Sequence, residues 1–412
     1  MALTCPGCGA AILGQERFCE ACGRELAPAP PVPSSSVPSS SLAAQDGAAR
    51  VVPAQDGAAQ DGAARDGAAT DLRVVDTDLD ASPTACVACT AGHYVDGYCD
   101  QCGAAVPRVR DHFADMPAPW VAGVCDRGVR HARNEDAMAV AASGADAEAG
   151  GRAVLVVCDG VSSAPRSEIA SLAAARAARN ALVAGRDLTA AGAAAQFQAS
   201  GGRSGPHDVP TMAITMAAIA AAADVAHSGP PPAELSDPSF AGSACTLVMA
   251  VVEPAPNGGV RVNAGWVGDS RAYWLPDDAG ATAQQLTIDD SWAAEAIAHG
   301  VPREDAERMP QAHAITRWLG PDSPDPMPKR STIDVVGPGW VMVCSDGLWN
   351  YASPADQLAE LVRRFSTPPA TGAPHTVTPL TLADRLVGWA IEQGGHDNIS
   401  VTLARVSGRG KD

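Results

Sequence analysis

From Trp120 onward, short apolar runs alternate with polar, glycine-rich turns. Runs of this length that are bounded by Gly are typical of strands buried on both faces. The pattern predicts strands around a turn and then three successive antiparallel strands: Ala137–Val140, Ala153–Cys158, Cys245–Val252, Val260–Val267 and Arg271–Leu275.

Alanine-rich stretches interrupted by polar residues predict helices over Ser167–Ala184 and residues 211–226, and shorter helical pieces over Trp292–Gly300 and Arg303–Met309. Two stretches rich in Gly and Pro are predicted to be loop-like insertions, namely Ser200–Pro210 and His227–Ser239. Aromatic residues are only 4% of the chain, so the core must depend on Ala, Val and Leu.

The N-terminal part has a different composition. Residues 27–84 are rich in Pro, Ser, Ala and Gly, and the motif QDGAA begins at Gln45, Gln55 and Gln60. No apolar period is present, so burial cannot offset the entropy of ordering, and we predict a disordered linker. Whether the repeat has a meaning or is composition drift stays open.

Eight of the twelve cysteines form four C-x-x-C pairs. In a reducing cytosol such pairs are metal ligands more often than disulfides. Residues 1–26 and 85–106 are each predicted to be a zinc ribbon, with one structural Zn²⁺ held by four thiolates. The ligands are Cys5, Cys8, Cys19 and Cys22 in the first ribbon, and Cys86, Cys89, Cys99 and Cys102 in the second.

His93 is an alternative ligand, which we disfavour because four cysteines suffice. The other cysteines lie in or beside apolar runs and are expected to be small buried hydrophobes: Cys125, Cys158, Cys245 and Cys344.

The formal net charge of -18 argues against a nucleic-acid groove and against polybasic docking on a membrane. The chain begins without the layout of a signal peptide, and no uninterrupted apolar stretch reaches the roughly 18 residues of a membrane span. We therefore expect a cytoplasmic protein.

Four acidic residues stand at the ends of apolar runs or in glycine-rich turns: Asp159, Asp269, Asp346 and Asp397. A carboxylate at the rim of a buried strand is costly unless it is paired or holds a metal. Several such groups at one edge of a sheet would form an oxygen-rich site suited to Mg²⁺ or Mn²⁺. The alternative is that each Asp-Gly is only a turn.

The ordered motifs RNEDA, CDG, GSACTLVMAVV, VGDSRAYW, LTIDDSW, AITRWLG, CSDGLWNY and GGHDNIS resemble the metal-dependent (type 2C) Ser/Thr protein phosphatases of bacteria. The resemblance covers about Val121 to Ala404. It implies an α+β fold with two stacked, mostly antiparallel sheets flanked by helices, and metals at one end of the sandwich. We assign residues 113–408 to this domain, with a flap between LTIDDSW and AITRWLG.

The resemblance also implies site roles. Asp159 would bridge two Mn²⁺ or Mg²⁺ ions, with the Gly160 carbonyl on one of them, and Asp346 and Asp397 would complete the other shell. Glu135 and Asp136 would act through metal-bound water. Asp269 matches a ligand of a weaker third ion, and Asn398 a hydrogen-bond partner of the site.

The chain departs from the family at two places. His131 stands where many relatives carry an Arg that grips the substrate phosphate, so the phosphate-binding candidates are Arg130, His131 and Arg133, with the choice open. The stretch GVSSAPRSEIAS after Asp159 lacks a His, which leaves a metal-bound water as the simplest acid for the leaving group. Ser162, Ser163 and Arg166 either contact substrate or belong to a plain turn.

The implied function is hydrolysis of phosphoserine and phosphothreonine on proteins by a metal-activated water, with the ribbons docking partners or substrates. A Ser/Thr kinase is an expected partner. A cysteine nucleophile is excluded because no Arg stands six residues after any of the four buried cysteines. The alternatives are a catalytically weak scaffold that binds phosphoproteins, and ribbons that recruit the enzyme to nucleic acid. Few basic residues in the ribbons count against the latter.

Overall fold

The computed structural model describes residues 3–4, 11–12, 72–79, 81, 83–185, 209–228, 242–256, 258–323, 325–367 and 377–408. The cysteines of the first predicted ribbon and most of the predicted linker lie outside these residues. Within the first ribbon, β1 (Leu3–Thr4) and β2 (Ala11–Ile12) form an antiparallel pair.

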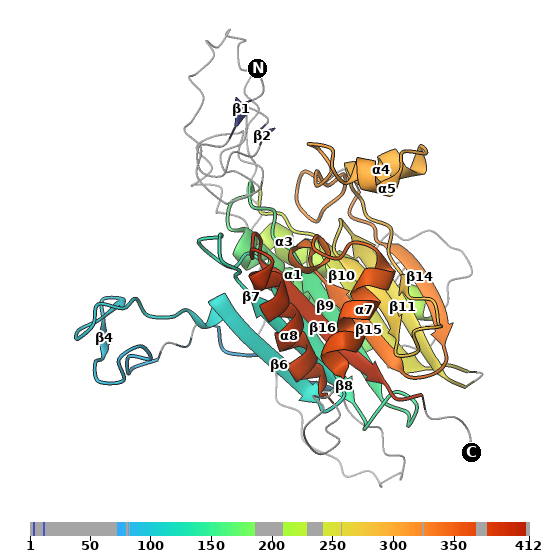
Figure 1. Cartoon of the computed structure of the whole chain (residues 1–412), viewed down its shortest axis with the longest axis horizontal. Coiled ribbons are helices and arrows are strands. Elements are labelled where there is room, and N and C mark those ends of the chain that lie inside the picture. The colour runs from blue at the N-terminus through green and yellow to red at the C-terminus, as the bar shows by residue number, and fades with distance from the viewer. Residues whose placement is uncertain are drawn as a thin grey trace, which may run out of the picture.

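Two six-stranded antiparallel sheets stack face to face (Figure 1). The first has the order β14-β11-β10-β9-β8-β3 and contains β3 (Arg73–Val74), β8 (Ala137–Ser143), β9 (Arg152–Cys158), β10 (Leu247–Pro254), β11 (Val260–Val267) and β14 (Lys329–Val335). The second has the order β13-β12-β15-β16-β7-β6 and contains β6 (His112–Ala118), β7 (Val121–Asp126), β12 (Arg271–Pro276), β13 (Gln284–Gln285), β15 (Gly339–Cys344) and β16 (Ile399–Val406).

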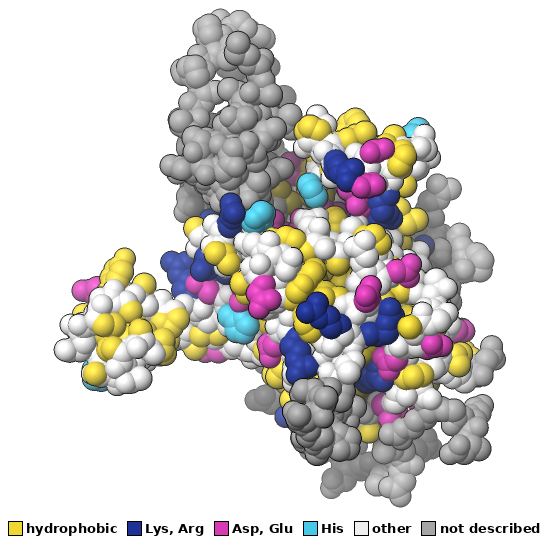
Figure 2. Space-filling view, viewed as in Figure 1, with side chains coloured by type: hydrophobic (Ala, Val, Ile, Leu, Met, Phe, Trp, Pro, Cys, Tyr) yellow, Lys and Arg dark blue, Asp and Glu magenta, His cyan; other side chains and the backbone are white. Residues whose placement is uncertain are grey.

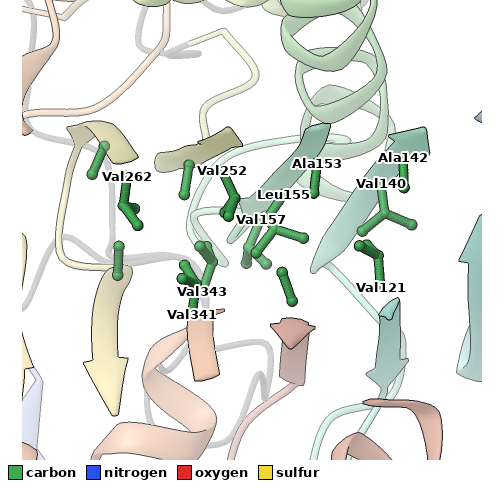
Figure 3. Close-up of a cluster of buried hydrophobic side chains, with 14 of the residues drawn as sticks. Val121, Val140, Ala142, Ala153, Leu155, Val157, Val252, Val262, Val341 and Val343 are labelled. Atoms are coloured by element: carbon green, nitrogen blue, oxygen red, sulfur yellow. The ribbon is translucent and has the colours of Figure 1, made fainter. Parts of the chain in front are cut away.

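The main core lies between the sheets, and Figure 3 shows Val140, Leu155, Val157, Val341 and Val343 within it. Successive residues of a strand point to opposite faces. The intervening residues of β8 and β9 therefore pack outward against helices. Because both faces of these strands are buried, their sequences are continuous apolar runs.

Helices cover both outer faces. On the first sheet lie α1 (Ser167–Ala184) and α3 (Val209–Ser228), whose many buried alanines let the two helices pack closely. On the second lie α6 (Asp346–Trp349), α7 (Ala355–Ser366) and α8 (Pro379–Glu392). The predicted α+β sandwich is thus confirmed. Among the described residues, no helix is both long enough and apolar enough to cross a membrane.

The flap projects from one end of the sandwich (Figure 1) and contains α4 (Trp292–Ala298) and α5 (Arg303–Ala306). Ala293, Ala306 and Ala312 form a small core of its own. Both helices are shorter than predicted. The helix α4 ends before Gly300, whose φ of +93° is incompatible with a continuing right-handed helix.

The N-terminal boundary of the sandwich differs from the sequence-based expectation. Residues 72–79, expected to be linker, are part of the domain: β3 pairs with β8 at the edge of the first sheet. Asp76 accepts two hydrogen bonds from Arg179 of α1, at 2.5 and 3.1 Å, and Leu72 and Leu79 pack against the two cores. The linker prediction was wrong here because apolar residues and a charge partner for buried Arg179 give this short segment enough contacts to be ordered.

Candidate active site

Strand register brings the predicted aspartates to one end of the sandwich. Asp136 directly precedes β8 and Asp159 directly follows β9, and Ala137 is paired with Cys158 across these antiparallel strands. Asp136 and Asp159 are therefore neighbours at the same edge of the first sheet.

The second sheet supplies the other ligands in the same way. Asp346 comes two residues after β15, and Asp397 comes two residues before β16, while Cys344 of β15 pairs with Val401 of β16. Asp269 occupies the turn that joins β11 to β12. One end of the sandwich thus carries five aspartates from both sheets.

Burial and mutual repulsion disfavour full ionisation of this cluster. Burial, followed by the charges of Asp136 and Asp346, raises the pKa of Asp159 well above its usual range. Burial and Asp346 do the same for Asp269. Burial raises the pKa of Asp136 to about 7 despite hydrogen bonds from Ser345 and Ser400, and burial with Asp346 raises that of Asp397 to about 8. Such a cluster needs protons or cations to be stable.

The residues fit a divalent cation. Within the described part of the chain, Asp136 Oδ1 and Asp346 Oδ1 are buried oxygens without a hydrogen-bond partner, which is costly unless a cation or the water bound to it completes them. The donors are all oxygen, as Mg²⁺ and Mn²⁺ prefer.

Hydroxyl groups hold the carboxylates in place. Ser345 and Ser400 both donate to Asp136 Oδ2, at 2.7 and 2.8 Å. Thr246 Oγ1 accepts from the Asp159 backbone N–H at 3.0 Å and contacts Ser270 Oγ at 2.9 Å. These residues were not predicted from the sequence. Their only sequence signal was position, since Ser345 and Ser270 adjoin Asp346 and Asp269.

Two glycines allow close backbone approaches around the aspartates. A Cβ on Gly160 would lie 2.6 Å from the carbonyl oxygen of Glu135, and one on Gly347 would lie 1.9 Å from that of Asn398. The glycines that follow Asp159 and Asp346 are therefore required by packing, whatever their further role.

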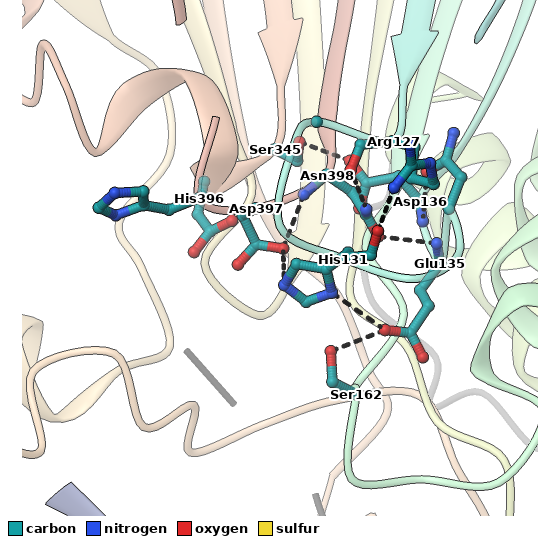
Figure 4. A network of polar contacts seen from close by, with 12 residues as sticks. Arg127, His131, Glu135, Asp136, Ser162, Ser345, His396, Asp397 and Asn398 are labelled. Atoms are coloured by element: carbon teal, nitrogen blue, oxygen red, sulfur yellow. Dashed lines mark hydrogen bonds and ion pairs between the residues drawn. The ribbon is translucent and has the colours of Figure 1, made fainter. Parts of the chain in front are cut away.

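Glu135 is engaged by the protein itself. Its carboxylate accepts a hydrogen bond from Ser162 at 2.9 Å (Figure 4). It also accepts from Ser167 at 2.7 Å and from Arg133 at 2.7 Å. Burial would raise the pKa of Glu135, but contacts with His131, Ser167 and Arg133 outweigh it and lower the pKa to about 2. Glu135 is thus a fixed negative charge beside the cluster.

The three phosphate-binding candidates have different surroundings. His131 is buried between Glu135 and Asp397. Arg133 is half-buried and paired with Glu135 and Glu168. Arg130 is exposed. Asn398, predicted to be a hydrogen-bond partner of the site, accepts from the Glu135 N–H at 2.7 Å and donates to the Arg127 carbonyl at 2.8 Å.

A cavity of about 860 Å³ opens above the aspartates. Asp159, Asp269, Asp346 and Asp397 line it on one side, and the flap lines it on the other with Ile297, Arg303, Glu307 and His313. Figure 2 shows a hollow between the flap and the body of the domain. Ser162 also lines the cavity, so the loop after Asp159 faces this space.

A second candidate metal site lies in the hairpin of β4 (Tyr94–Val95) and β5 (Tyr98–Cys99), which projects from the sandwich (Figure 1). The sulfur atoms of Cys86, Cys89, Cys99 and Cys102 all lie within 4.8 Å of one another, with Cys86–Cys102 at 3.6 Å and Cys89–Cys99 at 3.7 Å. Four Zn–S bonds in a tetrahedron would place the sulfurs about 3.8 Å apart. We call residues 85–106 the four-cysteine module. The four other cysteines are fully buried, as predicted.

Comparison with solved structures shows the fold. A bacterial serine phosphatase matches with a TM-score of 0.51 and 20% identity, covering 73% of this chain and 100% of that one. The serine/threonine phosphatase Stp1 from Staphylococcus aureus matches with a TM-score of 0.50 and 21% identity, covering 71% of this chain and 98% of that one.

A search of curated proteins finds no match. The family model for protein phosphatase 2C matches residues 127–379, which include Asp136, Asp159, Asp269, Asp346, Glu135 and the flap. This span is more than half of the chain, and it carries four of the five aspartates that strand register brings together. The chain therefore belongs to the protein phosphatase 2C family.

Proposed function

We propose that this protein hydrolyses phosphoserine and phosphothreonine on proteins at a binuclear Mn²⁺ or Mg²⁺ centre. The observation that carries the proposal is the convergence of five aspartates on one end of the sandwich, beside a cavity, with two buried carboxylate oxygens that lack a partner among the described residues. Family membership supports the same chemistry.

Divalent ions held here would activate a water for attack on phosphorus and offset the charge on the phosphoryl oxygens. We assign Asp159 as the ligand that would contact both ions, because it lies beside Asp136 at the end of β9 and lines the cavity together with Asp346 and Asp397. The Gly160 carbonyl, Asp346 and Asp397 would complete the shells, and Asp269 would serve a weaker third ion.

The other residues position these groups and the substrate. Ser345 and Ser400 orient Asp136, and the fixed charge of Glu135 holds Ser162 at the edge of the cavity. A phosphorylated side chain would enter beneath the flap, where Ser162 and Arg303 offer polar contacts. Glu135 and Asp136 would contact the ions through water.

Turnover of a phosphoserine peptide and of an aryl phosphate, with and without Mn²⁺, tests the proposal. We expect Mn²⁺-dependent release of phosphate from both, and a loss of more than about 100-fold in Asp159→Asn, because an amide cannot supply the bridging charge. A control for folding is the thermal melt of the same variant. A protein that binds phosphopeptides without turnover would instead be a scaffold.

We further propose that the four-cysteine module holds one structural Zn²⁺ and docks phosphoprotein substrates or a Ser/Thr kinase. The sulfur spacing supports the ion. Val87, Val95 and Tyr98 support docking, because these apolar side chains are 57–63% exposed on the module. Elemental analysis should find two Zn²⁺ per full chain and one after removal of residues 1–26. Zinc that persists in Cys86→Ser/Cys89→Ser at the level of the parent would contradict the assignment.

A further inference from the structure

His131 lies between two carboxylates that come from opposite sides of the site. Its Nδ1 is 3.5 Å from Glu135 Oε2, and its Nε2 is 3.3 Å from Asp397 Oδ1 (Figure 4). The side chain is 1% exposed. Both ring nitrogens thus lie within ion-pair distance of acidic groups of the protein itself, and Nε2 makes no hydrogen bond with any described residue.

The loop that carries His131 is closed by further hydrogen bonds. The Asn398 side chain donates to the carbonyls of Arg127 and Arg133, at 2.8 and 3.2 Å, and the Arg127 guanidinium donates to the His131 carbonyl. These bonds fix the backbone on both sides of His131. The Cα position from which the imidazole projects is therefore fixed.

The contacts of His131 continue across the interface between the sheets. Asp397 precedes β16 of the second sheet, whereas Glu135 precedes β8 of the first. Glu135 in turn accepts from Ser162, in the loop after Asp159, and from Ser167 at the start of α1. His131 thus joins the Asp397 loop to the loop that follows Asp159.

A phosphate dianion would meet an unfavourable environment at this imidazole. Both nitrogens already contact carboxylates, and like charges close together repel. The ring is buried, and neither His131 nor Glu135 is among the described residues that line the cavity.

We propose that His131 is a positioning residue that ties Asp397 to Glu135, and not a ligand of the substrate phosphate. This inference rests on the proposed function, because it assigns Asp397 to the metal centre. Without the imidazole, Asp397 loses a contact that orients its carboxylate, and the two sides of the centre lose a connection. Partners that orient metal ligands typically change metal affinity by about 10- to 100-fold when removed.

The test compares His131→Ala and His131→Gln with His227→Ala. His227 is an exposed histidine of α3 outside the cavity, and its ring contacts only the Ala223 carbonyl among the contacts described. The first measurement is the Kd of metal-free protein for Mn²⁺, by isothermal titration calorimetry. The second is the KM for a phosphoserine peptide and the inhibition constant of inorganic phosphate, both at saturating Mn²⁺.

We expect His131→Ala to raise the Mn²⁺ Kd by about 10- to 100-fold. In His131→Gln the carboxamide offers both a donor and an acceptor, so part of the affinity should return. The KM and the phosphate inhibition constant should change by less than about threefold, because the substrate does not touch the ring. His227→Ala should match the parent in all measurements.

An unchanged Kd in His131→Ala, or a tenfold rise in KM or in the phosphate inhibition constant at saturating Mn²⁺, would overturn the inference. If His131→Ala does not fold, the same measurements are made on His131→Gln, after a thermal melt has shown that this variant is folded. Failure of the proposed function would look different, since the unsubstituted protein itself would then neither bind Mn²⁺ nor release phosphate.

Discussion

The guanidinium carbon of Arg271 lies 3.5 Å from the centre of the Trp349 ring. Arg271 comes two residues after Asp269, and Trp349 ends the short helix that begins at Asp346, so this stacking joins two segments of the candidate centre. The same guanidinium donates to Asp289 at 2.6 Å and to Ser353 Oγ at 3.1 Å. Arg271 thereby links the candidate centre to the flap, because Asp289 directly precedes the flap and Ser353 donates to Glu307 of the flap.

Loosening the flap should affect peptides more than small substrates. Glu307 of the flap accepts a hydrogen bond from Ser353 at 2.6 Å and is paired with Arg303 at 2.9 Å. Glu307→Ala removes these contacts and should destabilise the closed position of the flap by about 1 kcal/mol. The equilibrium constant for flap opening should then rise about fivefold. We expect the KM for a phosphopeptide to rise several-fold, and that for an aryl phosphate to change little.

Glu304→Ala is the matched control, because Glu304 is an exposed residue of α5, three positions before Glu307, and contacts Arg308. Hydrogen exchange of the α4 and α5 amides should accelerate only in Glu307→Ala. Equal KM changes for both substrates would show that the flap does not discriminate by substrate size.

Removing Asp346 should weaken metal binding more than removing Asp269. Asp346 presents a buried oxygen without a partner among the described residues, and its charge acts on Asp136, Asp159 and Asp397. In Asp346→Ala, higher Mn²⁺ should therefore restore part of the turnover. Asp269→Ala should alter turnover chiefly at high Mn²⁺. Calorimetric titration with Mn²⁺ gives the Kd of each variant. Equal increases of the Mn²⁺ Kd in Asp346→Ala and Asp269→Ala would contradict this ranking.

Stability of the metal-free protein should fall as pH rises. Burial raises the pKa of Asp136 from 3.8 to about 7 and that of Asp397 to about 8. Between about pH 4 and pH 8 the folded state then binds more protons than the unfolded chain. The free energy of unfolding accordingly decreases as pH rises through this window. Mn²⁺ replaces the protons, so its affinity should increase over the same range.

Thermal melts at pH 5, 6, 7 and 8, with and without Mn²⁺, measure this effect. Asp136→Asn should flatten the profile of the metal-free protein, since one titrating group is removed. A melting temperature that rises from pH 5 to pH 8 in the absence of metal would contradict the assigned shifts.

The edge strand β3 and the residues that follow it should stabilise the phosphatase 2C domain. Asp76 is the bidentate partner of Arg179, whose side chain is 2% exposed, whereas that of Asp76 is 37% exposed. Asp76→Asn should lower the free energy of unfolding by about 1–3 kcal/mol, because the buried Arg179 guanidinium loses its charged partner. The loss is limited because solvent still reaches the side chain at position 76. Asp96→Asn, in the hairpin of the four-cysteine module, is the control.

Truncation gives an independent measure of the same contact. A chain that begins at residue 70 should melt close to the full chain, whereas one that begins at residue 83 should melt several degrees lower. Identical melting temperatures would mean that residues 72–79 are dispensable.

Strand and helix positions were accessible from the sequence because they follow from local patterning. The strands β8, β9 and β11 and the helix α1 match apolar runs or alanine-rich stretches whose bounds are visible in the chain. The aspartates were likewise identifiable, since a carboxylate next to a buried apolar run is costly without a partner.

What the sequence could not provide were the contacts between distant segments. Ser400 and Asp136 are 264 positions apart, and Asp76 and Arg179 are 103 apart, so no local pattern signals either pair. His131 showed the same limitation: its type and position placed it among the phosphate ligands, while its burial between Glu135 and Asp397 depends on how two sheets meet. The sequence determined the elements and the chemistry at their ends, because both depend on near neighbours. Only the tertiary structure decided which of those groups face each other, because strand register and sheet packing set those distances.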